Sequence, residues 1–447
     1  MLPIEFKIIE PDLQWVKYFE HEKKSLEQLI GTFLVSIHHI GSTAIPNMAA
    51  KPIIDIILET KNLDDIKVIE KLLCSHQYSQ FSRNIIPFRS YLTSKRSNIH
   101  VNCHIYEQGD PQIIRHLRFR DYLTTHAKEA QKYSELKIQL SKKYSTDVFK
   151  YVEAKTQLVR EIDANAKLWG EANENANYYH PQNPGNNIET WSIKKMVTLL
   201  EANFNIYLTH YPQYMPKVNF IRIPGYVLVD TGITQPYFNH VLDTHLSEPN
   251  VITKVNEFNT YFKIRKLPFS WWVTPNSCPL SLSQILMDSS LFNSKNFIGM
   301  SFNLDGSLIS SHQNILHIEK INARKSFAKL IGELPLAQQG LKQYLASIMA
   351  SYTYDDPFTF YAGYIDGQLI ICSAMVTYAQ CVGIYNLYLG EHDKNLHSLR
   401  QMEEHLLNEA KFSGYHLAVA LILETQLTFY TRRGFKKLCV FKQFQQA

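Results

Sequence analysis

The residues of the first third of the chain that are best suited to chemistry are a Gly41-Ser42 pair and one aspartate, Asp55. The pair follows the apolar run 35–40, and Asp55 lies within the next apolar run, 53–58. Glycine lets backbone amides come close to a phosphate, a serine hydroxyl can bond a phosphate oxygen, and a carboxylate can hold a divalent metal ion. The pattern therefore indicates a phosphate-binding turn with one candidate metal ligand.

Basic side chains further along this region could hold the same phosphates, because arginine donates bidentate hydrogen bonds and lysine supplies a point charge. The candidates are Arg89, Arg115, Arg118, Arg120 and Lys155. In the alternative interpretation, Arg118 or Arg120 pairs with a nearby acid such as Asp121. The lysines of the predicted helix 126–143 are then a solvated face.

The composition limits the classes of partner. The 447 residues contain 46 Lys and Arg against 41 Asp and Glu, a formal charge of +5, and 45% are hydrophobic. This mild surplus lacks the dense basic stripe that binding of duplex nucleic acid needs. Domains usually hold roughly 100–200 residues, so we expect two or three of them. The expected partner is a small molecule.

Cysteine usage and the N-terminal segment both indicate a cytoplasmic protein. The cysteines form no CxxC pair and no zinc-like spacing with histidine, which favours reduced, buried thiols. They are Cys74, Cys103, Cys278, Cys372, Cys381 and Cys439. The first residues, MLPIEFKIIEPD, lack the apolar stretch of a secretory signal. No apolar run approaches the roughly 20 residues of a membrane span, so no membrane contact is expected.

The elements that must position these residues fall into three blocks. Apolar spacing predicts a helix over 13–30, followed by strands at 35–40 and 53–58. An Asn-rich stretch at 163–190 is typical of a linker, and the turn signal Asp305-Gly306 marks a second boundary. The predicted domains are 1–168, 190–310 and 311–447, with a linker over 169–189.

The words around the Gly-Ser pair resemble the GrpB family, whose fold is similar to that of nucleotidyltransferases. The resemblance covers about residues 3–166 and rests on HHIGSTAIPNMAAKPIIDI, HVNCHIYE, RHLRFRDYL, AQKYSELKIQLSKKY and YVEAKTQLVREI. It implies a mixed-sheet domain that binds a nucleotide or a phosphorylated metabolite. The residues that it implicates are Gly41, Ser42, Asp55, Arg89, His104, Arg118, Arg120 and Lys155.

One departure bears on metal chemistry. Nucleotidyltransferases usually carry two carboxylates two positions apart on one strand, where alternation puts both on one face. Here Ile57 stands at the position of Asp55's partner, and His104 stands where a third carboxylate is expected. One carboxylate and one imidazole suit hard Mg²⁺ poorly. The sequence therefore does not favour a two-metal transfer, and Asp55 is a weak candidate for binding Mg²⁺.

The last block is a run of strands interrupted by two helices. The predicted strands are 316–321, 358–365, 369–378, 382–389, 416–423 and 434–444, with a hairpin at Asp366-Gly367. Helices are predicted over 396–412 and 425–433. This order, with the words GIYNLYL and AVALILETQLTFYTRRGFKK, resembles the GNAT N-acetyltransferase superfamily over about 311–445. The fold class expected for the whole chain is therefore α/β (α+β), with mixed sheets.

The GNAT resemblance implies acetyl-CoA as cofactor and an amine as acceptor. The strand at 383–389 would splay from its neighbour, and the backbone of Leu387, Tyr388 and Leu389 would pair with the pantetheine arm. The pyrophosphate would lie on a loop aligned with 394–399, beside Lys394, His397, Leu399 and Arg400. Tyr430 stands where the general acid for the leaving thiolate is expected, although it could equally be a packing residue.

The aligned loop departs from the family because His397 and Leu399 fill its two glycine positions. If those residues need positive φ, each Cβ costs on the order of 1–2 kcal/mol. Two such costs weaken binding roughly 30- to 1000-fold. Lys394, His397 and Arg400 could restore part of the attraction through their charge.

The middle block resembles the N-terminal half of tandem GNAT-like proteins, which usually lacks a cofactor motif. The resemblance rests on PFSWWV and the Gly-Met strand after it. Its aromatic residues Phe269, Trp271 and Trp272 are interpreted as packing residues rather than as a substrate wall.

Three hypotheses follow. The leading one is a GNAT-type acyltransferase fused to a GrpB-like domain that binds a nucleotide or phosphorylated metabolite. The second places binding or nucleotidyl transfer in the first block. The third is a pair of folds that have lost catalysis and act in recognition.

Overall fold

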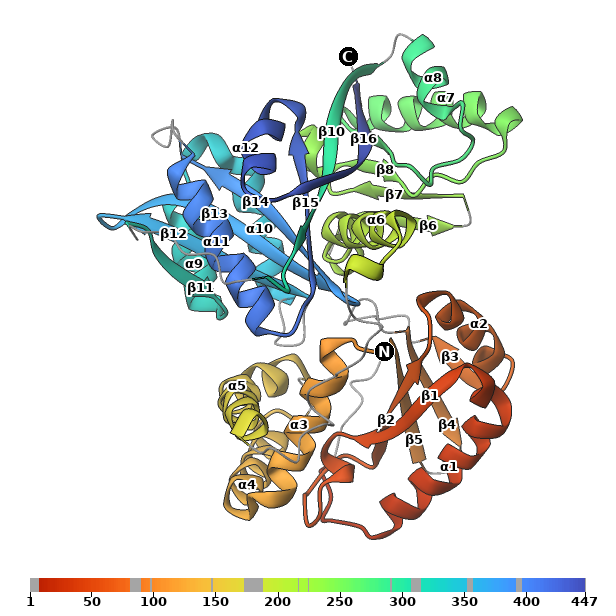
Figure 1. The fold of residues 1–447 in the computed structure, drawn as a ribbon, viewed down its shortest axis with the longest axis vertical. Coiled ribbons are helices and arrows are strands. Elements are labelled where there is room, and N and C mark those ends of the chain that lie inside the picture. Colours follow the sequence, from red (N-terminus) through yellow and green to blue (C-terminus); the bar gives the residue numbers. More distant parts are fainter. Residues whose placement is uncertain are drawn as a thin grey trace. The chain divides into compact units, whose positions relative to one another are not determined.

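The computed structural model describes residues 8–80, 90–96, 99–145, 148–172, 188–215, 217–223, 225–289, 292–306, 315–351, 357–390 and 396–446. The chain forms two compact units that divide between Asn186 and Asn187 (Figure 1). We call them unit 1 and unit 2. No helix in the described part of the chain is long and apolar enough to span a bilayer.

Unit 1 contains a five-stranded mixed sheet with the order β1-β2-β5-β4-β3. The central pair, β2 and β5, is parallel, and the other neighbours are antiparallel. The strands are β1 (Leu34–Ile40), β2 (Ile53–Thr60), β3 (Tyr78–Gln80), β4 (Ser90–Arg96) and β5 (Ile99–Glu107).

Helices cover both faces of this sheet because its strands alternate between two apolar sets. Ile54, Ile56 and Leu58 pack with the apolar stripe of α1 and with α2. Ile57 packs on the other face, against α3. The helices are α1 (Gln14–Ile30), α2 (Leu63–Cys74), α3 (Pro111–Thr125), α4 (Ala127–Lys143) and α5 (Val148–Ala172). The segment between β1 and β2 packs on α3, α4 and α5 through Ile45 and Met48.

Unit 2 contains an 11-stranded mixed sheet with the order β11-β12-β13-β14-β15-β10-β16-β9-β8-β7-β6. The strands are β6 (Asn219–Ile223), β7 (Tyr226–Asp230), β8 (His240–Leu242), β9 (Ser270–Val273), β10 (Phe292–Asn303), β11 (His317–Ile321), β12 (Phe358–Ile365), β13 (Gln368–Tyr378), β14 (Cys381–Leu389), β15 (Leu417–Leu423) and β16 (Lys436–Gln446). The mixed sheets of both units confirm the expected fold class. The predicted hairpin is confirmed as well, since Asp366 and Gly367 both have positive φ and join β12 to β13.

The sheet of unit 2 repeats one motif. In each half an antiparallel meander ends in a strand that crosses through a helix to a parallel neighbour, as β8–α7–β9 and as β14–α11–β15. The two halves exchange their last strands: β10 lies between β15 and β16, and β16 lies between β10 and β9. The boundary predicted near residue 310 therefore falls between two strands, β10 and β11, of one continuous sheet. The pairing of β10 with β16 joins the two halves of that sheet.

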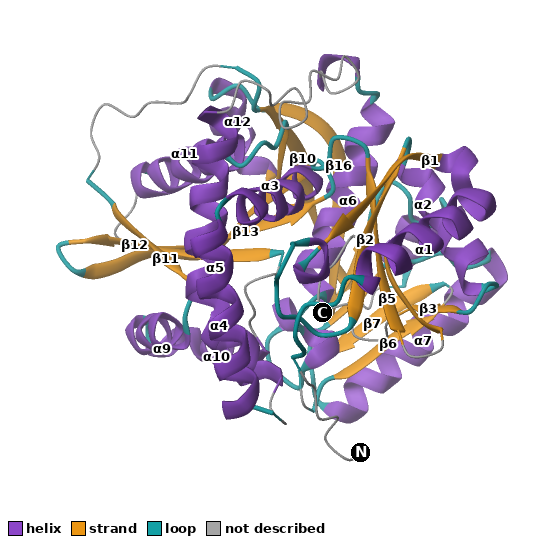
Figure 2. Ribbon diagram, turned by 90° about the horizontal axis from the view of Figure 1, so that it is seen from below, coloured by secondary structure: helices purple, strands orange, loops and turns teal. Residues whose placement is uncertain are grey.

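Helices also cover both faces of the C-terminal half of this sheet. In Figure 2, α11 and α12 lie on one side of β12 and β13, and α9 and α10 lie on the other. The helices of unit 2 are α6 (Ile193–Thr209), α7 (Glu248–Arg265), α8 (Leu282–Asp288), α9 (Arg324–Glu333), α10 (Gln339–Ser351), α11 (His397–Phe412) and α12 (Leu427–Arg432). Of the predicted linker 169–189, the first residues continue α5 to Ala172, and 173–187 lie outside the described residues.

Candidate functional site

The Gly-Ser turn of unit 1 lies directly against Asp55. Gly41 follows the end of β1 with φ 72°, in the left-handed region. A Cβ on Gly41 would lie 2.6 Å from Asp55 Oδ2. The glycine is therefore required both by its backbone conformation and by the close approach of the carboxylate. Gly41 and Asp55, two of the candidate residues from the sequence, therefore lie directly against one another.

Asp55 shares its face of the sheet with an amide and an imidazole. In the parallel register, Asp55 is opposite Asn102, whose Nδ2 donates to Asp55 Oδ1 at 2.7 Å. His104 Nε2 is 3.7 Å from the same oxygen. Ile57, in the position of the missing second carboxylate, is fully buried in the core. Among the described residues, no group of three His, Cys, Asp or Glu side chains is placed to hold a metal ion.

Three of the predicted arginines, Arg115, Arg118 and Arg120, lie on α3 and contact neighbouring residues of unit 1. Arg120 donates from Nε to Asp121 and from Nη1 to the carbonyl of His39, the pairing that the alternative interpretation gave. Arg115 donates to Asp163 on α5 at 3.0 Å. Arg118 lies against Gly170 of α5, where a Cβ would be 3.1 Å from its Nε. Arg89 lies outside the described residues.

His39, at the end of β1, is held in its neutral form. Its ring stacks on Phe19, with centroids 4.6 Å apart, and its Nε2 lies 3.1 Å from Thr43 Oγ1. Burial lowers the pKa of His39 to about 4, with a smaller contribution in the same direction from Arg120. The His39 side chain therefore contributes no charge to the Gly-Ser turn at neutral pH.

Three lysines from different segments lie in this part of unit 1, one in contact with the turn and two beside the ring of Tyr151. Lys137 on α4 is only 3% exposed, and its Nζ donates to Ser42 Oγ at 2.8 Å. Lys51, between the turn and β2, lies 5.2 Å from the centroid of the Tyr151 ring, and Lys155 lies 5.7 Å from the same centroid. Of these lysines the sequence analysis identified only Lys155.

The pKa values of Lys51 and Lys137 are both lowered, and the charge of Lys155 contributes to each change. Burial lowers the pKa of Lys137 to about 7, and the charge of Lys155 acts in the same direction. Burial and Lys155 also lower the pKa of Lys51 to about 8, against the attraction of Asp55. A signal for Lys137 was present in the sequence, because it follows Ala130 and Tyr133 on the apolar face of α4.

In unit 2, the parallel strands β14 and β15 separate part of the way along. They pair at Cys381–Ile384 with Leu417–Ala420 and no further, although both strands continue. β14 stays paired with β13 as far as Leu389, with Leu387 bulged between the paired residues Asn386 and Tyr388. The splay predicted for 383–389 is thus confirmed, and it begins after Ile384. Bulges of this kind re-aim side chains and end pairing.

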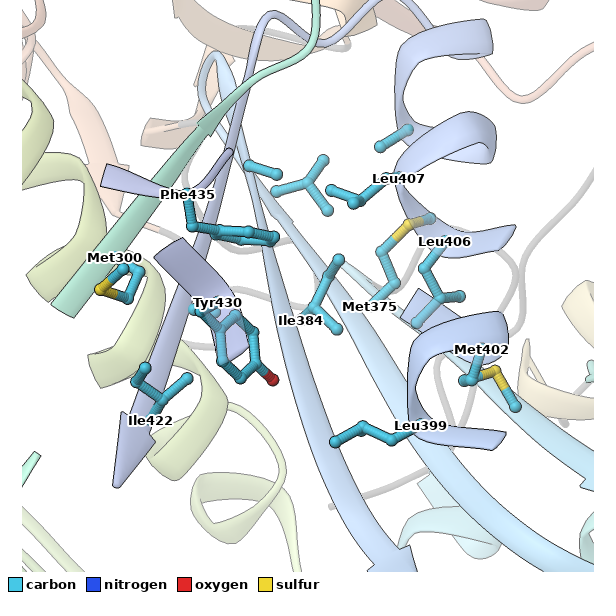
Figure 3. Close-up of a cluster of buried hydrophobic side chains, with 14 of the residues drawn as sticks. Met300, Met375, Ile384, Leu399, Met402, Leu406, Leu407, Ile422, Tyr430 and Phe435 are labelled. Carbon is cyan, nitrogen blue, oxygen red and sulfur yellow. The ribbon is translucent and has the colours of Figure 1, made fainter. Parts of the chain in front are cut away.

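A buried carboxylate lies beside this opening. Glu403 of α11 is 1% exposed and accepts hydrogen bonds from the Tyr430 hydroxyl and from Arg433, which also forms an ion pair with it. Asn386 Nδ2 donates to Glu403 at 3.2 Å, and Ser373 Oγ donates to Asn386 at 2.7 Å. Figure 3 shows the Tyr430 hydroxyl directed toward α11. The sequence analysis missed Glu403, which lies between Leu399 and Leu406 on the apolar side of its helix.

The predicted phosphate loop requires a correction. Helix α11 begins at His397, so His397 and Leu399 lie in its first turn and not in a loop. Leu399 packs in the core, and the residue with positive φ is the N-cap Leu396, at 54°. The cost assigned to glycine positions 397 and 399 therefore does not apply to them. Arg400 is paired with Glu404 at 2.7 Å, and Lys394 lies outside the described residues.

In the first half of unit 2, the corresponding crossover from β8 to β9 is packed with buried side chains. There β8 and β9 pair only at His240 and Val241, but every residue of β8 is buried. Phe269 and Trp271 belong to the core behind these strands, and Trp272 packs edge-on against Phe204 at 4.8 Å. The aromatic cluster is thus packing, as interpreted from the sequence.

Comparison with known proteins agrees with this division of the chain. A family model described as GrpB protein matches residues 5–165. UPF0157 protein YqkA of Bacillus subtilis is 37% identical over 171 residues, which are 38% of this chain and 50% of that protein. Glutamate-rich protein GrpB of Alkalihalophilus pseudofirmus is 33% identical over 154 residues, which are 33% of this chain and 88% of that protein. The chain thus spans half the length of YqkA and most of the length of the second relative.

Solved structures resemble each part of the chain. The crystal structure of conserved protein GrpB from Enterococcus faecalis is 31% identical and covers 36% of this chain and 99% of its own, with a TM-score of 0.34. A tandem GNAT protein from the clavulanic acid biosynthesis pathway is 12% identical and covers 58% of this chain and 95% of its own, with a TM-score of 0.37. The two halves of unit 2 repeat one motif, an antiparallel meander followed by a parallel crossover.

Proposed function

The chain belongs to the GrpB family through residues 5–165, and we propose that unit 2, which follows this family domain, is an acyltransferase. In this proposal it takes an acyl group from acyl-CoA and passes it to an amine. The single observation that carries the proposal is the separation of β14 from β15 after Ile384.

The separated edge of β14 suits an extended amide-containing chain. Main-chain groups of a strand that has left its neighbour can pair with an added strand. The pantetheine arm of coenzyme A carries amides and could occupy that place along Leu387, Tyr388 and Leu389, which are half-buried. The bulge at Leu387 and the exposed side chain of Asn386 keep this edge accessible.

Tyr430 is the proposed proton donor to the leaving thiolate. Burial and the neighbouring Glu403 raise the pKa of Tyr430, so the hydroxyl remains protonated at neutral pH, as a general acid must be. In this structure the single proton of the Tyr430 hydroxyl is donated to Glu403, so its transfer to the thiolate requires the hydroxyl to turn away from that carboxylate.

The beginning of α11 is the proposed place for the pyrophosphate. The first backbone N–H groups of a helix have no partner within the helix and favour an anion. His397 is exposed at this end, and Lys394 and Arg400 are the further candidates from the sequence. For Arg400 this role requires that it leave Glu404.

Titration calorimetry with acetyl-CoA tests the binding step, and release of free thiol in the presence of an amine panel tests transfer. We expect saturable acetyl-CoA binding and thiol release. Tyr430→Phe should lower the rate of release about 100-fold or more with little change in acetyl-CoA affinity. Tyr415→Phe, a change in the same core, is the matched control and should leave both unchanged. The absence of heat at millimolar acetyl-CoA, in a protein that is folded by circular dichroism, overturns the proposal.

A further inference from the structure

We propose that Ser42, Lys51, Lys137 and Lys155 of unit 1 form a binding site for the phosphate group of a phosphorylated small molecule, and that this site works without a metal ion. The proposal is independent of acyl transfer in unit 2. It differs from nucleotidyl transfer because the positive charge comes from lysines and not from metal ions.

The first support is the way in which Lys137 reaches the Gly-Ser turn. Its Nζ crosses from α4 to a serine 95 residues earlier in the chain and ends on a neutral hydroxyl, and the same Nζ lies 4.6 Å from the centroid of the Tyr133 ring. Lysine is rarely buried unless it is paired. A buried ammonium that ends on a hydroxyl beside a glycine turn is placed where a phosphate oxygen could replace or join that hydroxyl.

The second support is that the other two lysines lie beside one aromatic ring and that the charge of one of them, Lys155, acts on Lys137. Lys51 and Lys155 come from segments about 100 residues apart and share the Tyr151 ring. The charge of Lys155 acts on both Lys51 and Lys137. Like charges held together in a half-buried place repel one another. A dianionic phosphate would reverse this repulsion, whereas a neutral ligand would not.

The charge of Asp55, beside the turn, favours the lysine ammonium of Lys51, and this supports a phosphate site without a metal ion. Asp55 faces the turn, and its Oδ1 accepts from Asn102. A divalent cation bound to Asp55 would compete with the Lys51 ammonium that this carboxylate favours. Lysines bind phosphate as point charges and need no bridging metal.

Calorimetric titration of the full-length protein with inorganic phosphate, pyrophosphate and ATP, each with EDTA and again with Mg²⁺, tests the proposal. We expect binding in EDTA that Mg²⁺ does not strengthen. Because bound phosphate favours charged lysines, binding at pH 8 should take up protons, which is measured as a dependence of the heat on the buffer. The other charged groups that act on this cluster are Lys155, which disfavours the charges of Lys137 and Lys51, and Asp55, which favours that of Lys51. The three probes separate a site for a single phosphate from one that needs a diphosphate or a nucleoside.

Variants locate the site. Lys137→Met and Lys51→Met should each weaken binding at least 10-fold, and Lys137→Met should abolish most of the proton uptake. Lys132→Met, on the exposed side of the same helix, is the matched control and should bind as the parent does. If Lys137→Met fails to fold, Ser42→Ala and Lys155→Met provide the same comparison. The proposal is overturned if no probe binds in EDTA, or if Lys137→Met and Lys132→Met bind equally well.

Discussion

Two buried charges, one in each unit, have opposite surroundings. Lys137 in unit 1 and Glu403 in unit 2 both lie on the apolar side of an amphipathic helix, and both are almost completely buried. Glu403 accepts from Tyr430, Arg433 and Asn386, so its charge is neutralised within the fold. Lys137 ends on the neutral Ser42 hydroxyl, and Lys155 disfavours its charge.

This difference indicates a structural role for Glu403 and a ligand-binding role for Lys137. A buried ion that is paired and hydrogen-bonded stabilises a defined arrangement, although it gives little net stability over an apolar replacement. A buried ion near like charges is costly in the absence of a ligand, and such costs concentrate at functional sites. Glu403 therefore organises the wall of its opening, whereas Lys137 contributes to binding at the expense of stability.

The largest expected effect is the loss of the Glu403 carboxylate. Glu403→Leu leaves Arg433, Tyr430 and Asn386 without their common acceptor, and breaking a buried pair in this way costs about 3–5 kcal/mol. Urea denaturation followed by a signal from unit 2 measures the loss.

The matched control for this change is Glu409→Leu on the same helix. Glu409 is more exposed and pairs with Lys320 at the surface, so its loss should cost about 1 kcal/mol or less. Equal losses for the two variants would contradict the view that Glu403 organises a buried network.

A second test concerns the stability of unit 1 at acid pH. Burial lowers the pKa of His39 from 6.5 to about 4. The unfolded chain therefore binds an extra proton between these values, and stability falls as the pH drops from about 6.5 to 4. At about 1.4 kcal/mol for each pKa unit, the fall in pKa from 6.5 to about 4 gives His39 a contribution of about 3.5 kcal/mol.

Thermal unfolding of unit 1 across this range, in the parent and in His39→Gln, measures the effect. Glutamine keeps a polar group near Thr43 but does not titrate. The variant should lose this part of the acid sensitivity. A parent and a variant with the same slope would show that His39 is readily protonated in the folded state.

The architecture follows from the sequence further than the sites do. Alternating and helical apolar spacing identifies β2, β14 and α11, because these periods depend on local geometry alone. The Asp366-Gly367 turn is similarly local. The exchange of β10 and β16 between the halves of unit 2 is not local, since it pairs strands that are far apart in sequence. Periodicity indicates which face of a strand is buried but not which strand lies beside it.

The sites were predictable only where a motif carries them. Gly41, Ser42 and Asp55 stand in a sequence motif that resembles the GrpB family, and the structure places Gly41 directly against Asp55. Lys137 and Glu403 stand in no motif, and each was passed over as one charged residue within a helix. A charged side chain on the apolar stripe of a helix is the signal that identifies both, because burial of such a group demands a partner or a ligand.

Replacement of Lys137 should have the opposite sign to replacement of Glu403. Lys137→Met removes an ammonium whose charge is disfavoured and keeps an apolar stem, so unit 1 should gain about 1–3 kcal/mol. In the parent, the folded pKa of about 7 lies below the ordinary value of 10.5. The unfolded chain holds more protons between these values, and stability therefore rises with pH from about 7 to 10.

Denaturation of the parent and of Lys137→Met at pH 7 and pH 9.5 checks both statements. The variant should be more stable at pH 7, and its advantage should shrink at pH 9.5. Lys132→Met should show neither change. A loss of stability in Lys137→Met at pH 7 would contradict this prediction. It would show that the charge of Lys137, like that of Glu403, stabilises the fold.

The smallest effect lies at the far end of the Glu403 network. Ser373→Ala removes the hydrogen bond to Asn386 Oδ1 and should cost about 0.5–1.5 kcal/mol. If the network acts as one unit, the double variant with Glu403→Leu should cost clearly less than the two losses together, because Asn386 has already lost its acceptor. Full additivity in this cycle would mean that Ser373 and Asn386 are held independently of Glu403. The network would then end at Tyr430 and Arg433, and the edge of β14 would be supported by its pairing with β13 alone.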